Sequence, residues 1–297
     1  MTLHLDERLA NAAFSSPNCD GSFTPDFADY LNDLGAMRPS VVLAFAPKAA
    51  GTFLRSAAIA AVGGALVRTV HAQGGRDANF YLPTFLLYYA GNFPPRPLVT
   101  HVHMQALPAN RHFIEALDLK PVIMVRAIPD MLASYADMLD ANPHSPDNWL
   151  NIRLPQNYAA LSPMAKNDFL IDMIGPWYAS YFATWLEYAE ESPGRVCILD
   201  YDNFLAEPVA ALEMLLVHSG LPQPRAVCQV ALDAVWESRA KFRFNKGASG
   251  RGLGRFTREQ LARLGRQIDF YPNLAVIRDR LIPPSASLLA RALSGAA

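Results

Sequence analysis

The stretch that decides the fold is VVLAFAPKAAGTFLR, residues 41–55. Residues 41–46 are apolar or small throughout, which predicts a strand buried on both faces. Ala49, Ala50 and Gly51 have almost no side chain, so the backbone of a tight turn can close on a ligand there. A small-residue helix follows, and the N–H groups at its start point at whatever lies in the turn. The segment therefore predicts a P-loop-like strand, turn and helix that cradle an anion, and phosphate is the anion that we expect.

The position of Lys48 argues against the Walker A version of such a cradle. That pattern, G-x-x-x-x-G-K-[ST], has its lysine after the second glycine, whereas Lys48 precedes Gly51. A triphosphate site with Mg²⁺ is therefore the poorer fit. A second glycine-rich run, NKGASGRGLGRFT at residues 245–257, suits a flexible flap over an anion. It is not a dinucleotide fingerprint, because Arg255 stands where G-x-G-x-x-G needs its third glycine.

Composition bounds the remaining possibilities. The chain has 297 residues and a formal net charge of −1, which gives no overall attraction to nucleic acid or to an acidic membrane. Its three cysteines show no C-x-x-C spacing and no even disulfide count, so we expect reduced, structural thiols. No stretch approaches the ~20 apolar residues of a membrane span, and the N-terminus lacks a signal-peptide pattern. We therefore expect a cytoplasmic protein.

Strand-like and helix-like segments alternate along the chain. Helices are predicted after the first, third and fourth strands. The predicted strands are residues 41–46, 98–102, 121–125 and 196–200. This order predicts an α/β fold with a central, mostly parallel sheet flanked by helices, in a single domain of residues 1–297. In such folds ligands collect at the carboxyl ends of the strands.

Two segments lie outside this alternation. Residues 1–38 are mixed and turn-rich, and we expect a poorly specified lead-in packed on the surface. Residues 141–176 are rich in proline, which predicts an irregular excursion before a helix at residues 177–190. An excursion of this length in a compact domain is typical of a lid or substrate loop.

Polar residues follow the predicted strands. Arg126 comes directly after residues 121–125, and Ser134 lies about one and a half turns inside the next helix. An arginine at a strand tip with a serine nearby can fork onto a phosphate, but taken alone this stretch favours an ordinary surface salt bridge and a solvated serine. His101 and His103 would point to the same face of a strand. Neither has the spacing of a zinc site; each is compatible with a general base or with a hydrogen-bonded core histidine.

Taken in order, these segments resemble the sulfotransferases that use 3′-phosphoadenosine 5′-phosphosulfate (PAPS), and the resemblance covers residues 41–257. PKAAGTFL is similar to the family's P-K-x-G-G-T-x-L loop for the 5′-phosphosulfate, with Ala50 in place of the first glycine. THVHMQALP, residues 100–108, aligns with T-H-L-P-x-x-L-L-P and places His101 on the catalytic histidine. The resemblance implies that the 5′-phosphosulfate is bound by Lys48, Ala49, Ala50, Gly51, Thr52 and Phe53.

The same resemblance covers the other end of the nucleotide. Arg126 and Ser134 match the arginine and serine that hold the 3′-phosphate. LDYDNFLAEP is similar to the family's Y-E-D-L segment and puts Tyr201 near the adenine. KGASGRGLGRFT matches K-G-x-x-G-x-x-x-x-x-F-T and places Lys246 and Gly247 at the 3′-phosphate.

Three positions depart from the family pattern. Val99 stands where a lysine often precedes T-H, and Asn245 stands where an arginine usually precedes K-G. Gly252 replaces a tryptophan of the flap. These departures concern how the sulfuryl oxygens are neutralised and how tightly the flap closes.

The resemblance implies in-line sulfuryl transfer to a hydroxyl or amine of a small-molecule or carbohydrate acceptor. His101 would be the general base, with His103 as the alternative, and Lys48 with the N–H groups of residues 50–53 would stabilise the leaving phosphate of adenosine 3′,5′-bisphosphate (PAP). No metal and no nucleic-acid partner is expected, and a homodimer is compatible with the resemblance. The acceptor face is expected at residues 71–85, with Phe80 and Tyr81, and in the excursion that contains Trp149 and Tyr158. These aromatic residues could line a pocket, although aromatic residues in loops more often anchor the loop to the core.

Two other classes of protein share parts of this pattern. A P-loop phosphotransferase would use an acidic metal ligand, for which Asp200 or Asp202 could serve. A non-catalytic nucleotide-binding module would keep Lys48, Arg126 and Ser134 but tolerate any residue at position 101.

Overall fold

The computed structural model describes most of the chain. The described residues are 25–37, 39–70, 79–81, 83–84, 88, 96–141, 152, 154–238 and 249–284.

Within these residues, five strands form one open sheet in the order β2-β3-β1-β4-β5. The strands are β1 (Ser40–Leu43), β2 (Ala65–Leu66), β3 (Leu98–His101), β4 (Pro121–Val125) and β5 (Cys197–Asp200). Every pairing between them is parallel, which confirms the predicted α/β fold. The carboxyl ends of parallel strands meet at one edge of the sheet, so the residues that follow β1, β3, β4 and β5 converge there.

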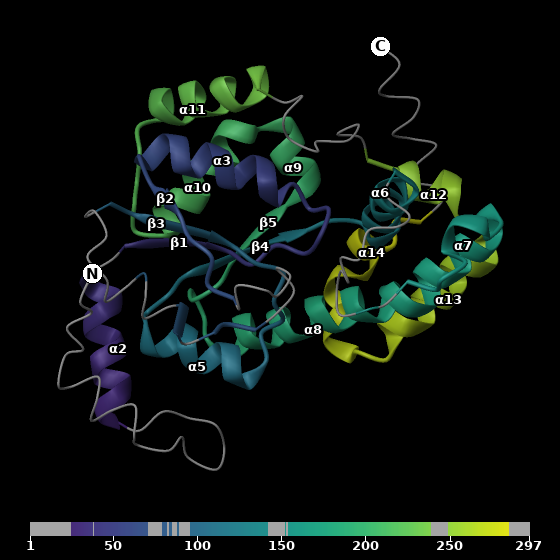
Figure 1. Ribbon diagram of the computed structural model, residues 1–297, viewed down its shortest axis with the longest axis horizontal. Coiled ribbons are helices and arrows are strands. Elements are labelled where there is room, and N and C mark those ends of the chain that lie inside the picture. Colours follow the sequence, from purple (N-terminus) through teal and green to yellow (C-terminus); the bar gives the residue numbers. More distant parts are fainter. Residues whose placement is uncertain are drawn as a thin grey trace.

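Helices cover both faces of this sheet. Those nearest to it are α2 (Pro25–Met37), α3 (Gly51–Val62), α5 (Pro108–Ala116), α8 (Gly175–Glu191), α9 (Tyr201–Ala206), α10 (Pro208–His218) and α11 (Arg225–Glu237). Figure 1 shows α3, α9, α10 and α11 on one face of the sheet, and α2, α5 and the part of α8 nearest to the sheet on the other. Both faces of β1 and β4 are therefore covered, which is why all residues of β4 and residues 41–43 of β1 are buried.

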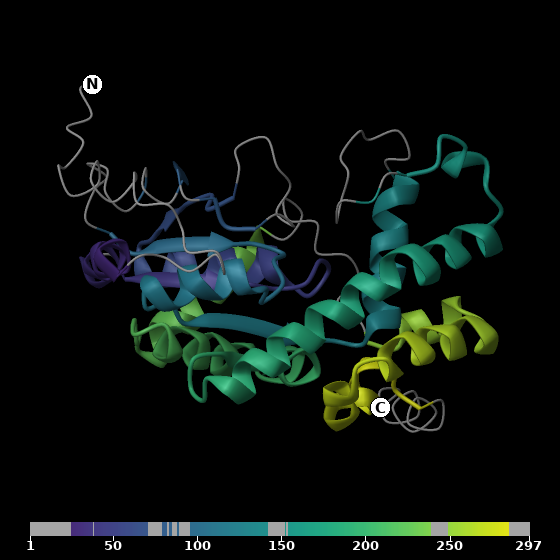
Figure 2. The ribbon, with the colours of Figure 1, turned by 90° about the horizontal axis from the view of Figure 1, so that it is seen from below.

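The remaining helices gather beyond the carboxyl ends of the strands (Figure 1). They are α6 (Ile128–Ala141), η2 (Tyr158–Ala160), α7 (Pro163–Phe169), the π-helix η3 (Leu170–Ile174), α12 (Arg251–Arg255), α13 (Arg258–Asp269), η5 (Pro272–Ile277) and α14 (Arg278–Leu281). Helix α8 continues α7 and η3, and Figure 2 shows it running from the sheet into this helical group. The long helix thus connects the two parts of the molecule.

The strand β1 is shorter than its apolar run. Residues 41–46 are all buried and were expected to be extended, but the strand ends at Leu43. The carbonyls of Ala44 and Phe45 bond to the side chains of Tyr181 and His103 instead of continuing the ladder. Apolar character records burial, whereas strand pairing also needs a neighbouring backbone.

The expectation of a poorly specified lead-in is wrong for its second half. Residues 25–37 form the helix α2, in which Leu31 and Leu34 are buried. Helix α2 approaches the end of α5 so closely that a Cβ added to Gly35 would lie 2.2 Å from the carbonyl oxygen of Leu117. Residues 1–24 lie outside the described residues.

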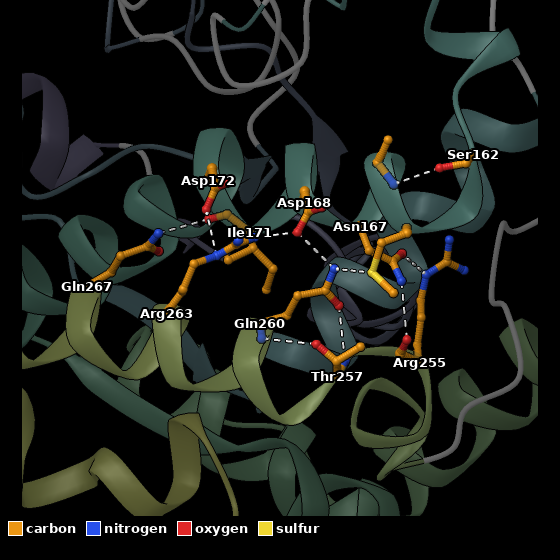
Figure 3. A network of polar contacts seen from close by, with 12 residues as sticks. Ser162, Asn167, Asp168, Ile171, Asp172, Arg255, Thr257, Gln260, Arg263 and Gln267 are labelled. Atoms are coloured by element: carbon orange, nitrogen blue, oxygen red, sulfur yellow. Dashed lines mark hydrogen bonds and ion pairs between the residues drawn. The ribbon is translucent and has the colours of Figure 1, made fainter.

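The expectation of an irregular segment at residues 141–176 is wrong from residue 163 onward. Pro163 and Pro176 do not break helices; they occupy the first turns of α7 and α8, where a missing N–H leaves no bond unmade. Figure 3 shows α7 and the π-helix joined to α13 by a row of polar contacts, such as those between Asp168 and Gln260. Residues 142–151 of this segment are outside the described residues.

Two further expectations concern thiols and membranes. Cys197 and Cys228 are free thiols, and burial raises the pKa of Cys197 to about 11, as expected for an inert structural cysteine. Among the described residues, no helix combines the length and the apolar character that a membrane crossing requires.

Candidate active site

The loop between β1 and α3, residues 44–50, has a strained and uncapped geometry. Lys48 and Ala50 adopt left-handed backbone conformations, with φ of 68° and 60°, which cost a non-glycine residue about 1–2 kcal/mol each. No side chain caps the start of α3. At this helix start, the N–H groups of Phe53 and Leu54 donate to the carbonyl of Ala50. The N–H groups of Ala50, Gly51 and Thr52 make no hydrogen bond to another described residue. An uncapped helix start of this kind fits an anion.

The carbonyl groups of this loop are held by side chains from three other elements. Tyr181 Oη donates to Ala44 O, Tyr178 Oη to Pro47 O at 3.0 Å, His103 Nδ1 to Phe45 O at 2.7 Å, and Arg126 Nη1 to Lys48 O at 2.5 Å. All four donor residues are buried. With its carbonyls engaged toward the protein interior, the loop keeps its strained shape.

His101 lies directly against the start of α3. A Cβ added to Gly51 would be 2.1 Å from His101 Nε2 and 2.5 Å from Cε1, so no side chain fits at position 51 while the imidazole keeps its place. The ring is buried, 7% exposed, and contacts the ring of Phe45 edge-on. The structure therefore brings the end of β3 together with the helix start that follows the loop.

His103 has a different role. Its Nδ1 must carry the hydrogen that bonds Phe45 O, because a carbonyl only accepts. Its ring is edge-on to that of His101, with centroids 4.8 Å apart. Of the two histidines, His103 is thus committed to holding the loop, and His101 is the one that faces Gly51.

Arg126 links the ends of β1, β4 and β5. Besides bonding Lys48 O, its guanidinium carbon lies 3.9 Å from the centre of the Tyr201 ring, a stacked cation–π contact. Burial raises the pKa of the Tyr201 phenol, and the positive charge of Arg126 opposes part of that rise. Ser134 is buried in α6 beyond this point, 8% exposed.

A line of aromatic rings continues from Tyr201 to the surface. The ring of Phe204 lies 6.0 Å from that of Tyr201 and 6.0 Å from that of Phe53, and the ring of Trp236 is edge-on to Phe53 at 6.0 Å. Trp236 is 48% exposed. No sequence motif points to Trp236, and its only signal is its place before the glycine-rich run at residues 245–257.

The end of the glycine-rich run packs on α6. The buried carboxylate of Asp130 accepts hydrogen bonds from the N–H groups of Gly250 and Gly252, at 2.8 and 2.7 Å. A Cβ at Gly252 would lie 2.2 Å from Pro129 O, so only glycine allows α12 to approach α6 this closely. That explains why no tryptophan can stand at this position here. Lys246 and Gly247 lie outside the described residues.

The departure from the family pattern at Val99 also has a structural reason. Val99 is fully buried, and a Cβ at Gly64 would lie 2.9 Å from its Cγ2. Position 99 therefore points toward the backbone that follows α3, where a charged side chain would be desolvated.

The two acids considered as metal ligands are engaged elsewhere. Asp200 Oδ1 caps α9 by accepting from the N–H groups of Asp202 and Asn203, and its Oδ2 is 3.3 Å from Arg280. Asp202 Oδ1 accepts from Ser249 at 2.5 Å. Among the described residues there is no group of three or more potential metal ligands.

The aromatics expected on the acceptor face behave differently from one another. Phe80 is buried edge-on against Phe113, and Tyr158 is 1% exposed and packs against Phe169. Both serve as anchors of their segments. Tyr81 is 40% exposed, and Trp149 lies outside the described residues.

Comparisons with known proteins find similar solved structures but no match by sequence. No protein-family model matches the sequence, and no curated protein matches it. The crystal structure of the mouse sulfotransferase SULT7A1 complexed with PAP is similar over 83% of this chain and 90% of that chain, with a TM-score of 0.57 and 15% identity. Retinol dehydratase in complex with androsterone and the inactive cofactor PAP is similar over 87% of this chain and 88% of that chain, with a TM-score of 0.47 and 14% identity. The likeness to the mouse structure shows that the chain has the fold of the PAPS-dependent sulfotransferases.

Proposed function

We propose that the protein is a PAPS-dependent sulfotransferase that acts on a hydroxyl or amine of a small-molecule or carbohydrate acceptor. The observation that carries this proposal is that the end of β3 and the residue after β4 converge on the β1–α3 loop and the helix start that follows it. Gly51 lies against His101, and Lys48 O accepts from Arg126. The fold likeness to a sulfotransferase supports the same conclusion.

The residues present fit the donor nucleotide. The uncapped N–H groups of residues 50–52 suit its 5′-phosphosulfate. Arg126 and Ser134, with Lys246 and Gly247, would hold the 3′-phosphate, and Tyr201 with the exposed ring of Trp236 would contact the adenine. When bound, PAPS supplies an activated sulfuryl group whose leaving group is PAP.

His101 is the base in this proposal. Its Nε2 side faces the helix start at Gly51, so it would take the proton of the acceptor as the new S–O or S–N bond forms. The S–O bond to the 5′-phosphate breaks in the same step. Lys48 and the N–H groups of residues 50–52 would stabilise the negative charge that grows on that phosphate.

The competing function is a P-loop phosphotransferase that requires Mg²⁺. It is less well supported, because the carboxylates of Asp200 and Asp202 are already bonded to their neighbours. A nucleotide-binding module without catalysis would give histidine at position 101 no task.

Calorimetry with PAP and with ATP, each with and without Mg²⁺, tests the proposal. We expect PAP to bind without metal and more tightly than ATP. Preference for ATP with Mg²⁺ would contradict the proposal and favour the phosphotransferase. A homodimer and a cytoplasmic location remain part of the proposal and need sedimentation and cell-fractionation measurements.

A further inference from the structure

Two tyrosine hydroxyl groups of helix α8 bind backbone carbonyls of the β1–α3 loop. Tyr178 Oη donates to Pro47 O at 3.0 Å, and Tyr181 Oη donates to Ala44 O. Both side chains are 0% exposed. Burial raises the pKa of both phenols, so each hydroxyl keeps the proton that it donates.

The same helix also holds the segment that follows His101. Trp185 Nε1 donates to Met104 O at 3.0 Å, and Thr184 Oγ1 accepts from the N–H of Ala106 at 3.2 Å. A continuous helix is stiff over this distance, so its contacts set the loop that carries Lys48 in register with the strand end that carries His101.

We propose that Tyr178 and Tyr181 are positioning residues for sulfuryl transfer, acting through the carbonyls of Pro47 and Ala44. The proposal rests on the proposed function. In a trans peptide the C=O and the following N–H point in opposite directions. Fixing Pro47 O toward α8 therefore turns the N–H of Lys48 away from α8, which sets the orientation of that peptide group within the loop.

The test compares two nucleotides that differ only in the 5′-phosphate, the group that the loop is proposed to bind. PAP carries a 5′-phosphate and adenosine 3′-monophosphate does not, so the ratio of their dissociation constants measures what the loop contributes. Tyr178→Phe and Tyr181→Phe each keep the buried ring and remove only the hydroxyl. We expect each substitution to raise the dissociation constant of PAP by about 2- to 12-fold, the range for the loss of one neutral hydrogen bond. Affinity for adenosine 3′-monophosphate should stay unchanged, and kcat should fall at least as much as PAP affinity.

Tyr188→Phe is the matched control. Tyr188 lies on the same helix and is equally buried, but its hydroxyl bonds none of the loop carbonyls, all of which are described. This variant should leave both nucleotide affinities and kcat unchanged.

Two outcomes would overturn the positioning role: equal weakening of both nucleotides, as from a general loss of structure, or no weakening of either. Thermal melting checks that each variant is folded, and each tyrosine variant decides the role of its own residue. If the unaltered protein shows no preference for PAP over adenosine 3′-monophosphate, the proposed function fails instead.

Discussion

The β1–α3 loop and the contact between α7 and α13 are both built from side-chain hydrogen bonds, yet they differ in kind. At the loop, buried side chains bond to uncharged backbone carbonyls. Between α7 and α13, charged side chains bond to one another at the surface (Figure 3); Asp168 and Arg263, for example, are 2.5 Å apart with side chains 39% and 29% exposed.

The difference teaches which part of the molecule is rigid. A buried carbonyl that loses its donor cannot turn to water, so the loop has one stable shape. Exposed ion pairs exchange with water and salt at little cost, because such pairs contribute only about 0–1 kcal/mol. Changes at the loop should therefore act on chemistry, and changes at the α7–α13 contact on stability alone.

The largest effect is expected from removing the proposed base. His101→Asn should lower kcat by about 10²- to 10⁴-fold, the usual worth of a general base, with PAP affinity unchanged within about twofold. His103→Asn is the comparison, because an asparagine amide can still donate to Phe45 O. This variant should lower kcat by about tenfold or less. Steady-state rates with a generic acceptor and calorimetry make the comparison; full activity in the His101 variant would move the base to His103.

A methyl group at the start of α3, directly after the loop, should have the next largest effect on turnover. Gly51→Ala places a Cβ 2.1 Å from His101 Nε2 in the present geometry, so either the imidazole or the helix start must move. A shift of about 1 Å in a reacting group costs on the order of 10²-fold in rate. Gly254→Ala is the control, since an added Cβ there meets nothing within 4 Å. Equal activities for the two variants would show that the contact at Gly51 has no bearing on turnover.

The buried carboxylate on α6 allows a sharper comparison within the helical part. Asp130→Asn keeps the shape but turns one acceptor into a donor that faces an N–H of Gly250 or Gly252. We expect the free energy of unfolding to fall by about 1.5–3 kcal/mol, as for a lost charged hydrogen bond. Asp137→Asn, which removes partly exposed pairs with Arg251 and Arg255, should cost less than about 1 kcal/mol. Urea unfolding measures both, and a larger loss in the Asp137 variant would reverse this ranking.

The smallest effect concerns acid stability at the α7–α13 contact. Hydrogen bonds from Gln260, and then from Arg263, hold the pKa of Asp168 below its ordinary value. A carboxylate with a lowered folded-state pKa contributes stability above the unfolded value, about 3.9, and loses it as the pH falls through the folded value. Asp168→Asn should therefore cost less than about 1 kcal/mol at pH 7.

Melting temperatures of both proteins between pH 7 and acid conditions test this assignment. The difference between them should shrink as the pH falls below the ordinary carboxyl range. A difference that stays constant with pH would mean that the charge of Asp168 plays no part.

Much of the sheet half could be predicted from the sequence. The apolar runs at β1, β3, β4 and β5 announced a buried parallel sheet, and β4 begins and ends where its run does. The convergence of Lys48, His101, Arg126 and Tyr201 followed from their places at strand ends. The helices at residues 25–37 and 163–174 do not follow from the sequence pattern, because mixed polarity and proline are typical of turns, although proline is also tolerated in a first helical turn.

The partners of the loop were beyond prediction. Tyr178 and Tyr181 were expected to be helical, but nothing local shows which tyrosine reaches which carbonyl. The bonds join residues separated by 131 and 137 positions. The role of Asp130 could not be predicted either, because the N–H groups that donate to its carboxylate lie 120 and 122 positions away.

By itself the sequence determined the strand, the small-residue turn and the helix start at residues 41–55, because burial and backbone freedom depend on residue type over a few neighbouring positions. Only the tertiary structure decided that His101 packs on Gly51, that α8 holds the loop, and that Gly252 meets Pro129. These contacts depend on how distant elements approach one another, and close packing selects a residue only once its neighbour is in place.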